Sequence, residues 1–243
     1  MREEGNPPAF RLDSVGRFGY TVRIMENWQR VFEAIASGDA KAFAEILASD
    51  PQAAMARNEK GVSAVLWAAY NRRWDMVAVV IDRGIPLDIW EASATGRTDR
   101  VQELARRAPA LIDAVSPDGF SPLGLAAFFG REDTAEFLID EGADVNARSR
   151  NELGVAPLHS AVAARNEQIV GALLDAGASP NPVQQGGLTP LHAAAALGDG
   201  PIVALLLASG ADRNARTNDG KTPLALAEEK NQKAAAELLR KEE

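Results

Sequence analysis

The chain has 243 residues, of which 46% are hydrophobic and 25% charged, values that fit a folded protein with a continuous core. Cysteine is absent, which excludes disulfides, thiolate nucleophiles and thiolate metal sites. There are 26 Lys and Arg residues against 34 Asp and Glu residues, a formal net charge of -8. Domains that bind nucleic acid usually carry a basic surplus, so the composition argues against a nucleic-acid partner.

The N-terminal residues show no targeting signal. They lack the apolar core of a signal peptide, and no stretch of the sequence approaches the roughly 18 uninterrupted apolar residues of a membrane-spanning helix. We therefore expect a cytoplasmic protein with no membrane partner. Residues 1–24 carry no repeat signal and include Pro7, Pro8 and Gly16. They are predicted to form a flexible N-terminal arm, and Met25 would also suit a translation start.

From residue 25 onward the sequence repeats itself. An aliphatic residue, called the anchor below, recurs about every 34 residues, with one shorter step of 24 residues from the second anchor to the third. Self-similarity at a fixed period is the signature of a solenoid of stacked units. The anchors are Val31, Val65, Ile89, Leu123, Leu158, Leu191 and Leu224. The predicted repeat domain covers residues 25–243, in about seven repeats with boundaries 25–58, 59–86, 87–115, 116–149, 150–183, 184–216 and 217–243.

Other columns keep their chemistry from unit to unit. Counting from the anchor, positions +12 and +15 are apolar in every unit, and position +3 is always alanine. Helical periodicity predicts that the anchor, +3 and +7 share one face of a first helix, and that +12, +15 and +16 share one face of a second. A constant alanine lets adjacent layers approach closely. The alanines are Ala34, Ala68, Ala92, Ala126, Ala161, Ala194 and Ala227.

Glycine and proline mark the helix ends. Glycine is predicted to cap the second helix at Gly84, Gly142, Gly177 and Gly210, whereas Pro51 and Pro109 stop that helix in the first and third units. Proline just before the anchor suits the first helical turn, at Pro122, Pro157, Pro190 and Pro223.

These features resemble the ankyrin-repeat family. The stretch Thr189-Pro190-Leu191-His192-Ala193-Ala194 matches its Thr-Pro-Leu-His-x-Ala signature, and residues 156–159 and 222–225 are close variants. The resemblance spans residues 25–239, and the first three units are the most degenerate. It implies an all-α solenoid of helix-turn-helix units with projecting hairpin loops. Partners of such proteins usually bind the concave side of the first helices and the hairpin tips.

The short step from Val65 to Ile89 is the one departure from the period. The missing residues correspond to the hairpin loop between the second and third units. Residues 84–88 are therefore predicted to join helix to helix almost directly, which leaves a gap, or notch, in the row of hairpins.

No catalytic, cofactor-binding or metal-binding residue is predicted. His159 and His192 are the only histidines, and both occupy the motif position that the family uses to tie the turn together by hydrogen bonds. Residues 218–222, Asn-Asp-Gly-Lys-Thr, resemble the end of a phosphate-binding loop, but Ala215 stands where its first glycine belongs, so we expect a hairpin turn.

Aromatic residues are the informative side chains. Positions +2, +5 and +6 are predicted to lie on the concave side of the first helix. Bulky residues fill them in units two and four, and smaller residues in unit three, so the candidate partner-binding set is Trp67, Tyr70, Asn71, Ala94, Thr95, Phe120, Leu125, Phe128 and Phe129. Exposed apolar clusters often mark interaction sites. The alternative is that some of these rings fill the space left by the absent hairpin.

The sequence therefore favours a protein-binding adaptor, scaffold or inhibitor, acting as a monomer on a protein partner that it does not identify. A small-molecule binder or enzyme that uses the notch at the third repeat is the alternative. A third hypothesis, nucleic-acid binding through the arginines of units two and three, has the negative net charge against it.

Overall fold

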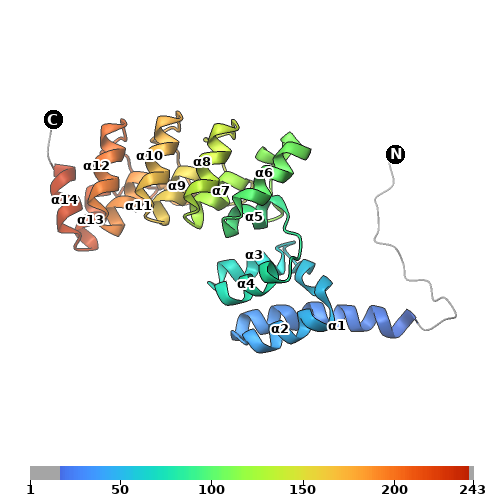
Figure 1. Ribbon diagram of the computed structural model, residues 1–243. Coiled ribbons are helices and arrows are strands. Elements are labelled where there is room, and N and C mark those ends of the chain that lie inside the picture. The colour runs from blue at the N-terminus through green and yellow to red at the C-terminus, as the bar shows by residue number, and fades with distance from the viewer. Residues whose placement is uncertain (1–16, 241–243) are drawn as a thin grey trace, which may run out of the picture. The chain divides into compact units, whose positions relative to one another are not determined.

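The structure is a computed structural model that describes residues 17–240, with side chains described from Asn27 onward. The described residues form fourteen α-helices and three short 3-10 helices, and no β-strand beyond two isolated bridges (Figure 1). The prediction of an all-α fold is confirmed. The α-helices are α1 (Arg17–Ser37), α2 (Ala40–Ser49), α3 (Ala64–Tyr70), α4 (Trp74–Asp82), α5 (Ile89–Thr95), α6 (Thr98–Arg107), α7 (Pro122–Phe128), α8 (Glu132–Asp140), α9 (Pro157–Ala163), α10 (Glu167–Asp175), α11 (Pro190–Leu197), α12 (Gly200–Ala208), α13 (Pro223–Glu229) and α14 (Lys233–Arg240).

The helices come in consecutive pairs, and each pair is joined through one residue in the left-handed region. That residue stands at position +7 in every pair, which corrects the prediction that +7 lies on the buried face of the first helix. Left-handed φ ends the helix and turns the chain back, so position +7 belongs to the turn. The residues, with φ between 55° and 76°, are Gly38, Arg72, Gly96, Gly130, Arg165, Gly198 and Asn231.

The predicted core columns are confirmed. All seven alanines at position +3 are at most 5% exposed, and every residue at position +12 is also buried. At position +15 only Leu104 is partly exposed. Small buried side chains at the centre of each first helix allow close packing of successive layers, so apolar area is buried between repeats rather than within one repeat.

The predicted helix ends are also confirmed. Gly84, Gly142, Gly177 and Gly210 all have positive φ immediately after a second helix. Pro51 and Pro109 follow the second helices of the first and third units, α2 and α6. Each proline begins a short 3-10 helix, η1 (Pro51–Met55) and η2 (Pro109–Asp113). The third 3-10 helix, η3 (Gln185–Gly187), lies in a hairpin.

The connection between α4 and α5 is short, as the 24-residue step predicts. Residues 83–88 join these helices, whereas residues 141–156 join α8 to α9. Asp88 begins α5 with a reciprocal cap, because its carboxylate accepts from the N–H of Glu91 and the Glu91 carboxylate accepts from the N–H of Asp88. This connection therefore has no room for a projecting hairpin.

The chain divides into two compact units. Unit 1 is Met1–Asn58 with Ser63–Ile85, and its described part holds α1 to α4, in which α3 packs on α1 and α4 on α2. Helix α1 begins at Arg17, so residues 17–24 of the predicted arm are helical, and residues 1–16 lie outside the described residues.

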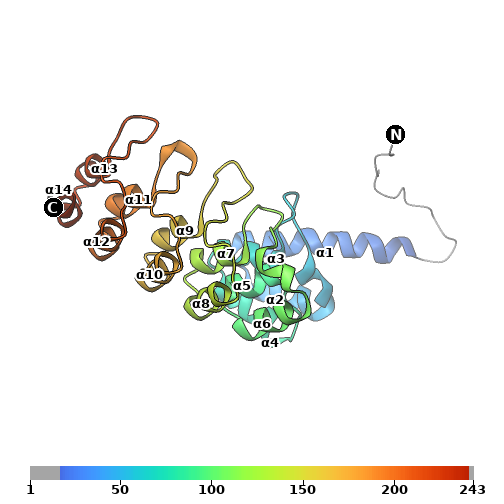
Figure 2. The same cartoon turned by 90° about the horizontal axis from the view of Figure 1, so that it is seen from above.

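Unit 2 is Glu59–Val62 with Pro86–Glu243, and its helices form two layers. Each first helix packs on the next one along the chain, in the order α5, α7, α9, α11 and α13. The second helices do the same, in the order α6, α8, α10, α12 and α14. The loops before α9, α11 and α13 project on the side away from the second helices (Figure 2). Backbone hydrogen bonds link neighbouring loops: Arg150 N–H to Gly119 O, Gln185 N–H to Leu153 O and Asn218 N–H to Gly186 O, at 2.7–2.9 Å.

Candidate protein-interaction surface

An aromatic pair, exposed at Phe128 and partly exposed at Phe129, lies at the C-terminal end of α7. Phe128 is the last residue of the helix and Phe129 caps it, with its N–H donating to the carbonyl of Leu125 at 3.0 Å. The rings meet edge to face, with centroids 5.0 Å apart and an interplanar angle of 88°. Phe128 is 43% exposed. Because the chain turns back at Gly130, the backbone places both rings at the edge of the first-helix layer rather than inside it.

The equivalent positions in neighbouring repeats of unit 2 carry no charge. Position +6 is Thr95 before the aromatic pair, and positions +5 and +6 after it hold the residues Ala163, Ala164, Ala196 and Leu197, all partly or fully exposed. The charged residues Glu229 and Lys230, at the C-terminal end of α13, end this row. The first-helix surface, defined as positions +5 and +6 from residue 95 to residue 197, is therefore an uncharged strip with one pair of large rings.

Two predicted partner-binding residues do not reach solvent. Leu125 is 1% exposed and Ala94 is 0% exposed, so the expectation that their side chains form part of an open surface is wrong. In the third, fourth and fifth units position +2 is buried, at Glu91, Leu125 and Ser160. Leu125 and Ala94 lie beneath the first-helix surface and support it.

Phe120 lies on the loop before α7 and is partly exposed. Its ring lies beside the start of that helix, since a Cβ on Gly124 would be 3.9 Å from Phe120 Cδ1. The backbone N–H of Phe120 donates to Ser116 Oγ and its carbonyl accepts from Ser116 N–H, both at 2.9 Å. This loop therefore holds the Phe120 ring in a fixed place on unit 2.

The other three predicted residues, Trp67, Tyr70 and Asn71, belong to unit 1. Trp67 and Tyr70 are partly exposed on α3, and Asn71 is exposed. The Asn71 amide donates to the carbonyl of Trp67 at 2.7 Å and so closes the end of the helix.

Arg131 supports the first-helix surface and was not among the predicted residues. Its guanidinium Nε donates to the carbonyl of Ala94 at 2.9 Å, at the end of α5, and burial lowers the pKa of this arginine. A Cβ on Gly96 would stand 3.1 Å from the Arg131 side chain, so the glycine makes room for it. Gln232 makes a similar bond to Ala196, as does Arg165 to Leu197. These side chains satisfy helix-end carbonyls in the adjacent repeat.

Both histidines tie turns together, as predicted. His192 Nδ1 accepts from the N–H of Thr189 at 3.2 Å, and its Nε2 lies 3.1 Å from the carbonyl oxygen of Lys221 in the next hairpin. His159 makes the same pair of bonds to Ala156 and Leu188. Both are buried, and burial lowers the pKa of each imidazole, to about 4 for His159.

Residues 218–222 form a hairpin turn. Thr217 N–H donates to Lys221 O at 2.9 Å, and Gly220 N–H donates to Thr217 O at 2.8 Å. The Lys221 ammonium pairs with Glu229 at 2.8 Å. Within residues 17–240, no group of three or more His, Asp and Glu side chains has metal-binding geometry. No helix in that part of the chain is long and apolar enough to cross a membrane.

Comparison with known proteins identifies the family. The model for ankyrin repeats in three copies matches residues 89–184 and 158–243, more than half of the chain. NF-kappa-B inhibitor delta of Mus musculus is 31% identical over 150 residues, which is 56% of this chain and 44% of that protein. The chain thus matches less than half the length of this relative. The number of repeats stays a prediction. Both matches support a protein-interaction module, and the chain belongs to the ankyrin-repeat family.

Proposed function

We propose that this protein is an adaptor, scaffold or inhibitor that binds a partner protein through its first-helix surface, the predicted concave groove, and the hairpin tips beside it. The main support is the edge-to-face pair of Phe128 and Phe129, with Phe128 43% exposed on an otherwise uncharged strip. Large exposed rings on a rigid helix end lose little conformational freedom on binding, so aromatic residues dominate the energetics of interfaces.

The residues beneath the first-helix surface favour a preformed binding site. Leu125 and Ala94 are buried below it, and Arg131 fixes the end of α5 against the turn that follows α7. A partner that docks there meets a surface whose backbone is already ordered, which lowers the entropic cost of association. Thr95 and Phe120 are proposed to contact the same partner.

Trp67, Tyr70 and Asn71 are proposed as a second contact region, on unit 1. Tyr70 occupies the same repeat position as Phe128, and Asn71 the same position as Phe129. The matched relative is named as an inhibitor of another protein, which agrees with this class of function but does not fix the partner here. We further propose that the protein acts as a cytoplasmic monomer.

Site-specific photocrosslinking tests the proposal. The photoreactive residue p-benzoylphenylalanine is placed at Phe128 in one variant and at Ala234, exposed on α14, in a control. Each variant is irradiated in lysate of the native cells, and adducts are identified by mass spectrometry. We expect one dominant protein adduct from position 128 that is absent from position 234. Equal adducts from both positions, or none from position 128, would contradict the proposal.

A further inference from the structure

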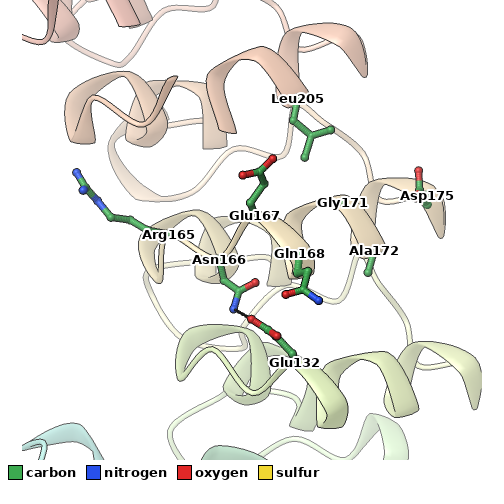
Figure 3. Close-up of a pocket in the computed structure, with 9 residues that line it drawn as sticks. All are labelled: Glu132, Arg165, Asn166, Glu167, Gln168, Gly171, Ala172, Asp175 and Leu205. Atoms are coloured by element: carbon green, nitrogen blue, oxygen red, sulfur yellow. Dashed lines mark hydrogen bonds between the residues drawn. The ribbon is translucent and has the colours of Figure 1, made fainter. Parts of the chain in front are cut away.

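Unit 2 has a hollow on its second-helix side, opposite the hairpins. Its volume is about 630 Å³, and it is open to solvent between α8, α10 and α12. A smaller hollow of about 110 Å³ between α8 and α10 shares Glu132, Gln168 and Ala172 with it. Figure 3 shows Glu132 from α8, Gln168 and Ala172 from α10 and Leu205 from α12 around this space. We call the two together the second-helix groove.

The floor of the groove depends on Gly171, in the middle of α10. Glycine in a helix interior costs about 0.5–1 kcal/mol relative to alanine, so it normally has a packing or conformational reason. Neither applies to Gly171, whose φ is not positive and whose added Cβ would meet only Leu205 Cδ2, at 3.9 Å. None of its neighbours among the described residues requires the glycine, and its effect is to keep the groove open.

The groove is also acidic. Of the side chains that line the larger hollow, Glu132, Glu167 and Asp175 are carboxylates, and Arg165 is the only cation. The Arg165 guanidinium donates to the carbonyl of Leu197 and points away from the hollow (Figure 3). Among the described residues, none of the three carboxylates has an ion-pair partner.

Amide groups hold one of these carboxylates in place. Asn166 Nδ2 donates to Glu132 Oε1 at 2.8 Å, and the amide of Gln168, oriented to satisfy its neighbours, donates to Glu132 Oε2 at 2.8 Å. Neutral donors fix the Glu132 side chain without cancelling its charge. The groove therefore presents a fixed negative charge on α8 and further negative charges on α10.

We propose that the second-helix groove binds a basic segment of a partner protein, with at least two Arg or Lys side chains on an extended backbone. Glu167 and Asp175 are eight residues apart on α10, which corresponds to about 12 Å along a helix. A single metal ion cannot bridge that distance. An extended peptide spans it in about four residues, at roughly 3.3 Å per residue. The small residues at the groove floor leave space for its backbone.

The test uses a peptide that carries fluorescein on its N-terminal amine, fluorescein-Gly-Arg-Gly-Ser-Gly-Arg-Gly-amide, whose arginines are four residues apart. Binding to the full chain is followed by fluorescence anisotropy, and the site is mapped by amide chemical shifts in ¹⁵N-labelled protein. We expect shift changes concentrated at residues 166–175 and 204–205. Glu167→Gln with Asp175→Asn should weaken binding at least tenfold. Asp219→Asn with Glu237→Gln, the same charge change at exposed sites elsewhere, should weaken it less than twofold.

Gly171→Leu separates shape from charge. Filling the groove should weaken peptide binding at least tenfold with no change in net charge, whereas Gly171→Ala should raise the melting temperature and have a smaller effect on binding. Shift mapping on the wild-type chain decides the question even if Gly171→Leu fails to fold. Shift changes located away from α8, α10 and α12, or equal weakening by both charge variants, would overturn the proposal. Spermine that binds as tightly at the same amides would overturn the assignment to a peptide.

Discussion

The imidazole Nε2 of His159 lies 3.1 Å from the carbonyl oxygen of Leu188, which belongs to the hairpin of the next repeat. On the other side of the ring, Nδ1 accepts from the N–H of Ala156 at 3.3 Å. A ring that accepts at Nδ1 and donates at Nε2 must be neutral. The repeat-to-repeat link through His159 therefore depends on the histidine staying unprotonated.

The first prediction is a loss of stability in mild acid. Burial lowers the pKa of His159 to about 4 in the folded protein, from an ordinary value of 6.5. Between these pH values the unfolded chain binds a proton at His159 that the folded chain does not. The contribution of the neutral ring to the free energy of unfolding is therefore fully present above pH 6.5 and is lost as the pH falls to about 4. Its size is about 3 kcal/mol at 1.36 kcal/mol for each pKa unit.

Urea unfolding of the wild type and of His159→Gln, from pH 7 to pH 4, measures this contribution. The free energy of unfolding should fall more steeply in the wild type, while the variant should be less stable at pH 7. NMR of the His159 ring gives a direct check, because its signals should not titrate above pH 5. A ring that titrates near pH 6.5 would show that the buried link does not exist in solution.

The second prediction compares two alanines. Ala126 is 0% exposed in the constant alanine column, whereas Ala164 is partly exposed at position +6. Ala126→Leu should destabilise the protein by about 1–3 kcal/mol, because it overpacks the contact between α7 and its neighbours. Ala164→Leu should cost much less. Chemical denaturation of the two variants is the measurement, and equal losses would contradict the register of the repeats.

The repeat register could be predicted from the sequence because close packing of the layers requires a small residue at the same position of every repeat. The alanine column that contains Ala126 shows this most clearly. The turn residues at +7 could not, since Arg72 and Arg165 also adopt the left-handed conformation there and give no glycine signal. The burial of Leu125 was missed because helical spacing alone does not say how near the adjacent helices lie. The second-helix groove could not be predicted, because the sequence does not show which side chains surround Gly171 in the fold.

The third prediction concerns the hairpins. Gly187 and Gly220 both have φ of 77°, so alanine is strained to a similar degree at each. A Cβ on Gly187 would lie 2.7 Å from the backbone nitrogen of Asn218 in the next hairpin, whereas a Cβ on Gly220 meets nothing within 4 Å. Gly187→Ala must therefore also separate the two hairpins.

Gly187→Ala should lower the free energy of unfolding by roughly 1–3 kcal/mol more than Gly220→Ala does, which is the usual cost of overpacking. Hydrogen exchange of the Asn218 amide reports the same contact, because its N–H donates to Gly186 at 2.9 Å. That amide should exchange faster in Gly187→Ala than in Gly220→Ala. Identical stability and exchange in the two variants would mean that the hairpins are not linked as described.

The fourth prediction follows from the aromatic pair of the first-helix surface. Phe128 is 43% exposed and outside the core between layers, so Phe128→Ala should leave the helical content and the melting temperature nearly unchanged. Tyr70→Ala, at the same repeat position in unit 1, tests the second proposed contact region in the same way. Circular dichroism of both variants checks that the fold is intact. Loss of helical structure would assign these rings to the core instead.

Calorimetric titration of the partner identified by crosslinking is the most direct test that this protein binds another protein through the first-helix surface. Phe128→Ala should weaken binding by about 2 kcal/mol, or roughly 30-fold in Kd, as expected of an interface hot spot. Glu229→Ala, an exposed change outside the first-helix surface, should alter Kd less than twofold. Unchanged binding by Phe128→Ala, or equal weakening by Glu229→Ala, would contradict the account.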